Sequence, residues 1–374
     1  MMRIFFGGDF CSRDPQAIIV EPALQSVMEG CDYRFLNFEG PIHKGQLNIA
    51  NSNILPQSDD SPAWCERQGF NIISVANNHA LDFSEEGLLA TINSFRQSIV
   101  LGGGTWEEAY KIKTISNGNM KIGFLAATSS DFASFKDKWT DADRIGCANV
   151  MGAEIERKIV TKNDFCDVLI LISHAGVEYC NVPLPELRDR YRRLTELGVD
   201  AIVAMHPHVP QGYEVYNGKP IFYSLGNFLF DRMNPAEPRH KYWGHGLSLV
   251  LEIDDNGGIT YQIVPVCYHD NVLGIDKEES ILEHEKWLND VLADDNQYIE
   301  TVNKEVQSLY PKYKGWLLSS FNAYESKGDL RSVYHFLRGL RKMANTRASL
   351  HQLREESTRW LLTRFLKNES NTTL

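Results

Sequence analysis

The feature that most limits the fold is an alternation of short apolar runs with amphipathic stretches over about two thirds of the 374 residues. The apolar runs are rich in Ile, Val and Phe and are bounded by Gly, Asn or Asp, a pattern typical of buried strands. We expect strands at Arg3–Gly8, Tyr33–Phe38, Asn71–Ala76, Lys121–Ala127, Asp167–Ser173, Asp200–Met205 and Pro220–Ser224. Helical patterns run from a Ser84 cap to about Ile99, and from Pro185 to a stop at Gly198. This alternation predicts an α/β domain.

The chain changes character after about Lys277. Before that point, Leu247–Val266 reads as a closing antiparallel hairpin. Beyond it the sequence is charged and helical. We therefore predict one domain over residues 1–272 and a helical C-terminal region over 277–374. The region is interpreted as an appendage with solvated charged faces, and docking of a partner is the alternative.

Composition excludes several classes of protein. Hydrophobic residues make up 43% and charged residues 23%, as in a globular chain, and the net charge of -11 gives no general attraction for nucleic acid. No apolar run approaches the roughly 18 residues of a membrane span or forms a signal-peptide core, so we expect a cytoplasmic protein. The 7 cysteines form no CxxC pair, which argues against a disulfide framework and a cysteine zinc knuckle.

Residues able to bind metal or phosphate stand where the predicted strands end. They are Asp9, Glu39, Asn77, Asn78, His79, His174, His206, His208, Ser224 and Asn227. In open α/β sheets the ligand crevice lies outside the carboxyl ends of the strands, so these groups are expected to converge. Each residue alone also suits a turn, a cap or a packed core position. Six strands that all end in this way favour one shared site.

Metal chemistry explains the residue types. Imidazole, carboxylate and amide oxygen together suit a divalent ion such as manganese, zinc or iron. We expect one or two such ions. The His206 and His208 imidazoles point the same way if their backbone is extended. His79 directly follows the predicted ligand Asn78, a place from which it could protonate a leaving group.

Several strings carry a family resemblance. GGDF, NFEGPI, ANNH, HAGVEY and HPHVPQ with YSLGNFLFD resemble the CapA family of bacterial capsule and poly-γ-glutamate synthesis proteins. The likeness extends over roughly Met1 to Val266. It implies an α/β fold of the calcineurin-like metallophosphatase type, in which a sandwich of two mixed β-sheets is flanked by helices.

The resemblance also implies roles for individual residues. The implied metal ligands are Asp9, Glu39, Asn78, His174, His206 and His208, with Glu39 as the bridging acid and His79 as the catalytic histidine. The implied substrate-pocket residues are Asn77, Glu178, Gln211, Ser224, Asn227 and Asp231. Two positions depart from the wider metallophosphatase pattern: Asp-x-His has become Asp9-Phe10-Cys11, and Glu39 replaces an aspartate.

Two functions remain open on the sequence. The first is a metal-dependent hydrolase of capsule or poly-γ-glutamate synthesis that acts on a phosphoester, with a small molecule or a polymer end as substrate. The second is a non-catalytic accessory protein that binds polymer, with a vestigial or structural metal site. In either case the C-terminal helices could dock a synthase, and neither nucleic acid nor a membrane span is expected.

Overall fold

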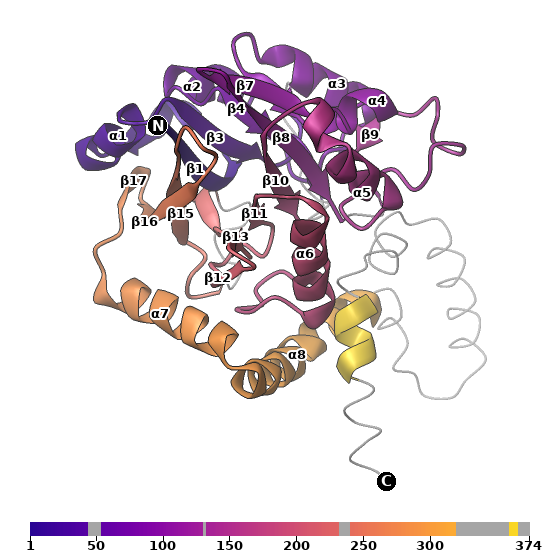
Figure 1. The fold of residues 1–374 in the computed structure, drawn as a ribbon. Coiled ribbons are helices and arrows are strands. Elements are labelled where there is room, and N and C mark those ends of the chain that lie inside the picture. Colours follow the sequence, from indigo (N-terminus) through magenta and orange to yellow (C-terminus); the bar gives the residue numbers. More distant parts are fainter. Residues whose placement is uncertain (44–53, 130–131, 232–239, 319–358, 366–374) are drawn as a thin grey trace, which may run out of the picture.

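A computed structural model describes residues 1–43, 54–129, 132–231, 240–318 and 359–365. Its larger sheet is mixed, with β1 parallel to β3 and antiparallel to β15. In order across the sheet, the strands are β2 (Ile19–Val20), β17 (Val272–Ile275), β16 (Ile259–His269), β15 (His245–Ile253), β1 (Met2–Cys11), β3 (Tyr33–Phe38), β4 (Ile72–Ser74) and β5 (Ile99–Leu101), with β14 (Asn227–Phe230) also paired to β1 (Figure 1).

The second sheet is also mixed, because β8, β10, β11 and β13 are parallel while both edge strands are antiparallel to their neighbours. Its order is β12 (Tyr213–Tyr216), β13 (Lys219–Phe222), β11 (Ala201–Met205), β10 (Val168–His174), β8 (Met120–Thr128) and β7 (Lys113–Asn117). A small ribbon pairs β6 (Gly103–Gly104) with β9 (Gly146–Cys147). The predicted sandwich of two mixed sheets is confirmed.

Helices cover the outside of the sandwich (Figure 1). They are α1 (Pro22–Glu29), α2 (Ser61–Arg67), α3 (Ser84–Ser94), α4 (Trp106–Ala109), α5 (Ala153–Val160), α6 (Pro185–Leu197), α7 (Glu279–Ala293) and α8 (Asp295–Leu318), with single 3-10 turns at Pro15–Ala17 and Lys162–Asp164. Residues 359–365 form a further helical segment. The predicted helix from Pro185 is confirmed, and Gly198 ends it with a φ of 133°.

Strand β10 shows why the central runs are apolar throughout. Val168, Ile170 and Ile172 belong to the core cluster between the two sheets. Leu169 and Leu171 belong to the cluster that packs under the helices on the outer face of the second sheet. Because successive side chains of a strand point to opposite faces, a strand buried on both sides must be apolar at every position.

One helix prediction was wrong at both ends. Ser84 does not cap α3, because it is the first helical residue and its hydroxyl donates to the Glu86 carboxylate instead of accepting from a backbone N–H. The helix stops at Ser94, and Ile99 lies in β5 rather than in the helix. Residues 99–101 pair in parallel with β4, so pairing at the sheet edge overrides the helical spacing of the apolar residues.

The C-terminal helices pack against the sandwich where the structure describes them. Leu288 and Val291 of α7 and Val302 of α8 are fully buried in the outer cluster of the second sheet. Arg364 forms an ion pair with Glu186 of α6, which draws the segment 359–365 onto the same face. The predicted boundary between 272 and 277 stays a prediction, and residues 319–358 and 366–374 of the predicted region lie outside the described residues. No helix in the described ranges has the length and apolarity needed to cross a bilayer.

Candidate metal centre

The glycine before Asp9 brings that carboxylate into the site. The pairing of β1 with β3 shifts register just before Asp9, and Gly8 adopts a φ of +125°. A Cβ atom at Gly8 would lie 2.6 Å from the carbonyl oxygen of Gly226, so no side chain fits there. The Asp9 carboxylate then accepts a hydrogen bond of 3.0 Å from the backbone N–H of His206, which directly follows strand β11 of the second sheet.

The ends of β3 and β4 supply the next ligands and are fastened together by Asn77. Glu39 directly follows β3, and Asn78 with His79 follows β4. The Asn77 side chain donates to the Phe38 carbonyl at 2.9 Å and accepts from the His79 N–H at 3.1 Å. Asn77 was predicted to line the substrate pocket, and its side chain bonds to the backbone of these two strand ends.

Three histidines come from the second sheet. His174 is the last residue of β10, and His206 follows Met205, the last residue of β11. Extended backbone was the condition for the His206 and His208 imidazoles to point the same way, and the backbone there is not extended, because the φ angles are 106° and 58°. Such angles are strained for residues with a Cβ and persist where surrounding contacts hold them, here the hydrogen bond from His206 to Asp9.

Glu39, His174 and His206 offer three buried ligand atoms within 4.8 Å of one another, a set we name position A. His174 Nε2 lies 3.0 Å from His206 Nδ1 and 3.7 Å from Glu39 Oε1. Asn78 Oδ1 lies 2.9 Å from the same His174 nitrogen. Atoms that share one ion through bonds of about 2.0–2.2 Å lie roughly 3–4 Å apart, so this spacing suits a cation.

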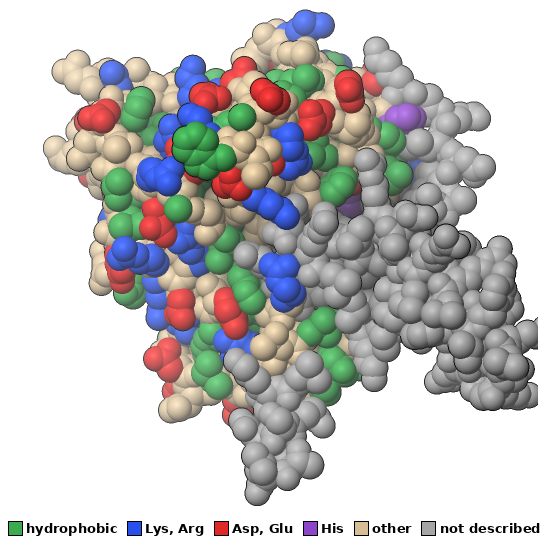
Figure 2. Space-filling view, turned by 90° about the vertical axis from the view of Figure 1, so that its right-hand side faces the viewer, with side chains coloured by type: hydrophobic (Ala, Val, Ile, Leu, Met, Phe, Trp, Pro, Cys, Tyr) green, Lys and Arg blue, Asp and Glu red, His purple; other side chains and the backbone are tan. Residues whose placement is uncertain are grey.

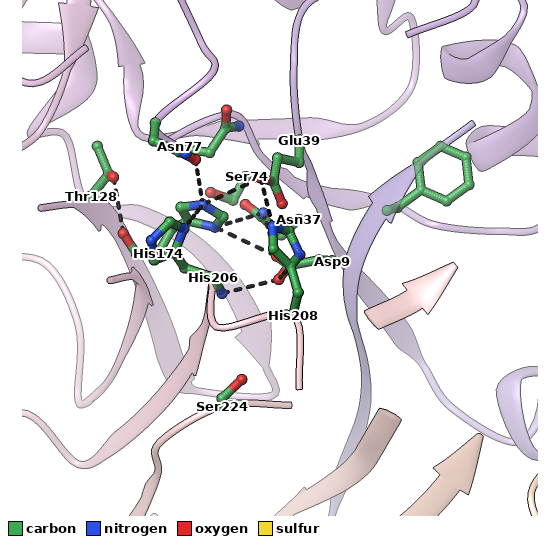
Figure 3. Close-up of polar contacts among 12 residues, drawn as sticks. Asp9, Asn37, Glu39, Ser74, Asn77, Thr128, His174, His206, His208 and Ser224 are labelled. Atoms are coloured by element: carbon green, nitrogen blue, oxygen red, sulfur yellow. Dashed lines mark hydrogen bonds and ion pairs between the residues drawn. The ribbon is translucent and has the colours of Figure 1, made fainter. Parts of the chain in front are cut away.

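Asp9, Glu39 and His208 form a second buried set within 4.8 Å, position B (Figure 3). His208 Nε2 lies 3.5 Å from Glu39 Oε1. Asn227 donates through Nδ2 to the Trp243 carbonyl at 2.9 Å, so its Oδ1 faces His208 Nδ1 at 2.9 Å and accepts the proton there. That hydrogen bond leaves the lone pair of His208 on Nε2, the nitrogen that faces Glu39.

The donor set fits a divalent cation. Both carboxylate oxygens of Glu39 are buried and have no hydrogen-bond partner among the described residues, an arrangement that is costly without a counter-charge. Burial, and to a lesser degree the nearby charge of Asp9, raises the pKa of Glu39 well above its ordinary value. Burial raises the pKa of Asp9 to about 6 against the opposing effect of His208. Burial lowers the pKa of His208 to about 3 and that of His174 well below its usual value, so both imidazoles are neutral, as metal ligands must be.

His79 is the accessible histidine beside this cluster. Its side chain is 20% exposed, whereas that of His174 is 1% exposed. His79 Nδ1 lies 2.7 Å from Asp82 Oδ2, which also accepts the Leu55 N–H at 2.7 Å. Asp82 therefore orients the ring and makes Nε2 the nitrogen that would give a proton to a substrate.

Residues 4–232 match the family model described as bacterial capsule synthesis protein PGA_cap. This range contains all the residues of positions A and B. The chain belongs to this family of bacterial capsule synthesis proteins. The resemblance seen in the sequence is thereby confirmed.

Relatives within this capsule synthesis family are moderately similar to the chain. The PGA biosynthesis protein CapA of Bacillus subtilis is 28% identical over 273 residues, which cover 69% of this chain and 67% of that protein. The capsule biosynthesis protein CapA of Bacillus anthracis is 29% identical over 249 residues, which cover 64% of this chain and 59% of the relative. The chain thus spans about two thirds or less of the length of these relatives.

Among solved structures, a 5′-nucleotidase from Candida albicans aligns with a TM-score of 0.42 and 10% identity, covering 82% of this chain and 57% of that chain. We draw no functional conclusion from a likeness of that size.

Other family-implied pocket residues lie around the centre rather than in it. Three of them bond through their side chains to loop atoms: Gln211 to the Cys180 carbonyl, Ser224 to the Val209 carbonyl and Asp231 to the Ser12 hydroxyl. In Figure 3 Ser224 lies apart from the ligand cluster. Glu178 is half-buried and near enough to Glu39 to contribute to the raised pKa of Glu39. Of the predicted pocket residues, Asn227 contacts a metal-centre side chain directly.

Cys11 is a packing residue. It is fully buried and packs in a cluster with Val209 and Trp243. Burial, and to a lesser degree the nearby charge of Glu39, raises the pKa of its thiol well above the ordinary value. The raised pKa disfavours the thiolate that a metal would need. Neither of the two metal-capable sets found among the described residues includes it.

Two functional residues escaped the sequence analysis. Asn37 donates to Asp9 Oδ1 at 2.8 Å and lies 3.1 Å from His174 Nδ1, so it fixes two ligands at once. A signal was present, since Asn37 is a polar residue in an apolar strand two positions before Glu39. Asp82 could have been found from its place three residues after His79.

Proposed function

We propose that the chain is a metal-dependent hydrolase of a phosphoester and acts in the synthesis of a capsule-type polymer such as poly-γ-glutamate. The observation that carries the proposal is the pair of buried ligand sets that share Glu39, an acid with no hydrogen-bond partner among the described residues. A carboxylate shared by two adjacent cation positions is the arrangement that two-metal phosphoester hydrolysis uses. The ions proposed are manganese, zinc or iron.

The residues divide into holding and proton-transfer roles. Glu39, His174, His206 and the Asn78 oxygen would hold one cation, and Asp9, Glu39 and His208 a second. A divalent cation bound there supplies Lewis acidity to a phosphoryl oxygen and a water of lowered pKa. Hydrolysis of the ester would form a bond from a water oxygen to phosphorus and break the ester P–O bond, with the water proton released to solvent.

Protonated on both ring nitrogens, His79 would give its Nε2 proton to the leaving alkoxide, while its Nδ1–H donates to Asp82 and keeps Nε2 aimed. The 20% exposure of the His79 side chain gives it access to substrate that the buried ligands lack. Removal of this proton donor should therefore affect turnover and leave the metal in place.

The test is elemental analysis of the purified protein, followed by phosphomonoester and phosphodiester panels with added Mn²⁺. His79→Ala should keep its metal and lose about 100-fold or more in turnover, the usual size of general acid catalysis. His269→Ala is the matched control, because that histidine is exposed on the surface and its ion-pair partner among the described residues is the exposed Asp270. Metal loss in His79→Ala, with turnover per bound metal unchanged, would contradict the assigned role.

A second function is favoured by one observation, the place of Cys11. Position B contains one imidazole, and the cysteine that replaces the usual histidine is buried and protonated. An accessory protein that binds a polymer end or a synthase would tolerate this loss. Metal-free protein with no hydrolytic activity, unchanged by His206→Ala, would support this second function and contradict the first.

A further inference from the structure

The loop after His174 lies against the segment that bears His206 and His208, and it contains an acidic residue. It runs through residues 175–184 between β10 and α6. Glu178 lies on it, half-buried, and directly precedes Tyr179, whose N–H donates to the carbonyl of Pro207, the residue between His206 and His208. Unlike the ligands, which stand at strand ends, Glu178 depends on the conformation of a loop. What fixes this loop therefore fixes where Glu178 stands.

Part of the loop is held by the neighbouring histidine segment. The Tyr179 N–H donates to the Pro207 carbonyl at 2.8 Å, and Gln211 donates to the Cys180 carbonyl at 2.9 Å. Tyr179 has a φ of 64°, an unfavourable angle for a residue with a side chain. Tyr179 directly follows Glu178, and a strained backbone angle of this kind persists where several surrounding contacts hold it in place.

Helix α8 supplies a second group of contacts to the loop. Tyr298 donates from its hydroxyl to the Pro183 carbonyl at 2.8 Å. Glu305 accepts two hydrogen bonds of 3.0 Å from Asn181, one from the backbone N–H and one from the side chain. Lys312 lies with Nζ 3.4 Å from the centroid of the Tyr179 ring.

The three helix residues share one face of α8. Tyr298, Glu305 and Lys312 follow one another at intervals of seven, and seven residues at 3.6 per turn make nearly two full turns. Val302 and Val306 of the same helix are fully buried, so this face is anchored in the core. Figure 1 shows α8 below α6. In the sequence, α8 lies beyond the family-matched range, which ends at residue 232.

We propose that this face of α8 is a latch that positions the 175–184 loop and hence Glu178 beside the metal centre, with Glu305 as its main positioning residue. The latch itself is a property of the folded chain. Its consequence for turnover rests on the proposed hydrolase function. A helix outside the region that defines the family would thus set the geometry of the site, rather than serve as a detached appendage.

The first test measures the loop directly, by hydrogen–deuterium exchange of the full-length, metal-free protein. Glu305→Ala should speed exchange of peptides spanning residues 176–182 about tenfold, because two hydrogen bonds to a charged group are lost. Glu300→Ala is the matched control on the same helix, since Glu300 is exposed and pairs with Lys304. Unchanged exchange in Glu305→Ala, or an equal change in Glu300→Ala, would overturn the latch.

Two further variants separate the latch from general loss of stability. Asn181→Ala removes one of the two hydrogen bonds from the loop side and should speed exchange about threefold without touching α8. Glu305→Gln keeps an oxygen that can accept from the Asn181 N–H and should restore part of the protection. A general loss of stability would instead speed exchange in α6 and β10 to the same degree as in the loop.

The second test links the latch to chemistry. With Mn²⁺ present, Glu305→Ala should keep its metal content and lose about tenfold in kcat/KM, whereas Glu300→Ala should match the parent. Faster exchange with unchanged kcat/KM would overturn the positioning role of Glu305 in the reaction. A parent protein with no hydrolytic activity would defeat the proposed function, and exchange would still decide whether the latch exists.

Discussion

Positions A and B share Glu39 but are built differently. Position A takes two imidazoles from the second sheet and the Asn78 oxygen from the first. Position B takes a second carboxylate, Asp9, and one imidazole, His208. Nitrogen-rich sets suit zinc or iron, while carboxylate-rich sets suit manganese. The difference teaches that position A holds two imidazoles, whereas position B holds one imidazole and two carboxylates, because Cys11 stands outside both sets.

The largest effect is expected from Glu39→Gln, which removes the acid common to both positions. Bound metal should be lost from both, with turnover reduced by roughly 100-fold or more. The metal-free variant should melt at a higher temperature than the metal-free parent, because an unpaired buried carboxylate has been neutralised.

Elemental analysis and thermal melts in chelator check both parts of this expectation. Glu29→Gln, a change at an exposed carboxylate on α1, is the control. Full metal retention in Glu39→Gln would remove the basis for a shared ligand.

The next largest effect separates the two positions. Loss of a residue that only supports a metal ligand typically weakens metal binding by about 10- to 100-fold. His206→Ala removes a ligand and should weaken cation binding at position A by more than that, while position B can still bind. His208→Ala should do the reverse. Calorimetric titration with Zn²⁺ and Mn²⁺ resolves the two events, with His269→Ala as the surface control. Equal loss at both positions from either substitution would mean that they act as one site.

Asn227→Ala should have a smaller effect, confined to position B. The substitution removes the acceptor that holds the proton on His208 Nδ1, so the ring can turn and its tautomer is no longer fixed. We expect affinity at B to fall about tenfold. Position A serves as the internal control in the same titration, and a matching loss there would show that Asn227 supports the fold rather than His208.

The smallest effect is expected from Cys11→Ser. Metal number and affinity should stay within about twofold of the parent, because the buried thiol is outside both ligand sets. The free energy of unfolding should fall by about 1–2 kcal/mol, since a hydroxyl replaces a thiol in an apolar cluster. Elemental analysis checks the number of bound metal ions. A large loss of metal in Cys11→Ser would instead make Cys11 a ligand.

Much of the fold could be predicted because its central strands are buried on both faces. The run that became β10 is apolar at every position for that reason, and Tyr33–Phe38 was predicted with the bounds that the structure has. The helix predicted to run to about Ile99 was too long, because the apolar residues at helical spacing continue into an edge strand that pairs with β4. Local pattern does not report which neighbouring strand is available for pairing.

The candidate site was predictable where ligands stand at strand ends and not where they are supported from afar. Asp9, Glu39, Asn78, His174, His206 and His208 all converge as expected. Asn37 and Asp82 were missed, although both lie within three residues of a predicted site residue. Glu305 carries no local signal, because its partner Asn181 is 124 positions away in the chain.

By itself, the sequence determined the residue types of the candidate metal centre and the layered fold, because residue type and apolar period are local properties of the chain. Tertiary structure alone decided that the ligands divide into two sets around Glu39, that His206 and His208 take left-handed backbone, and that α8 lies against the loop bearing Glu178. These arrangements depend on sheet register and on contacts between residues far apart in the chain, which no local pattern encodes.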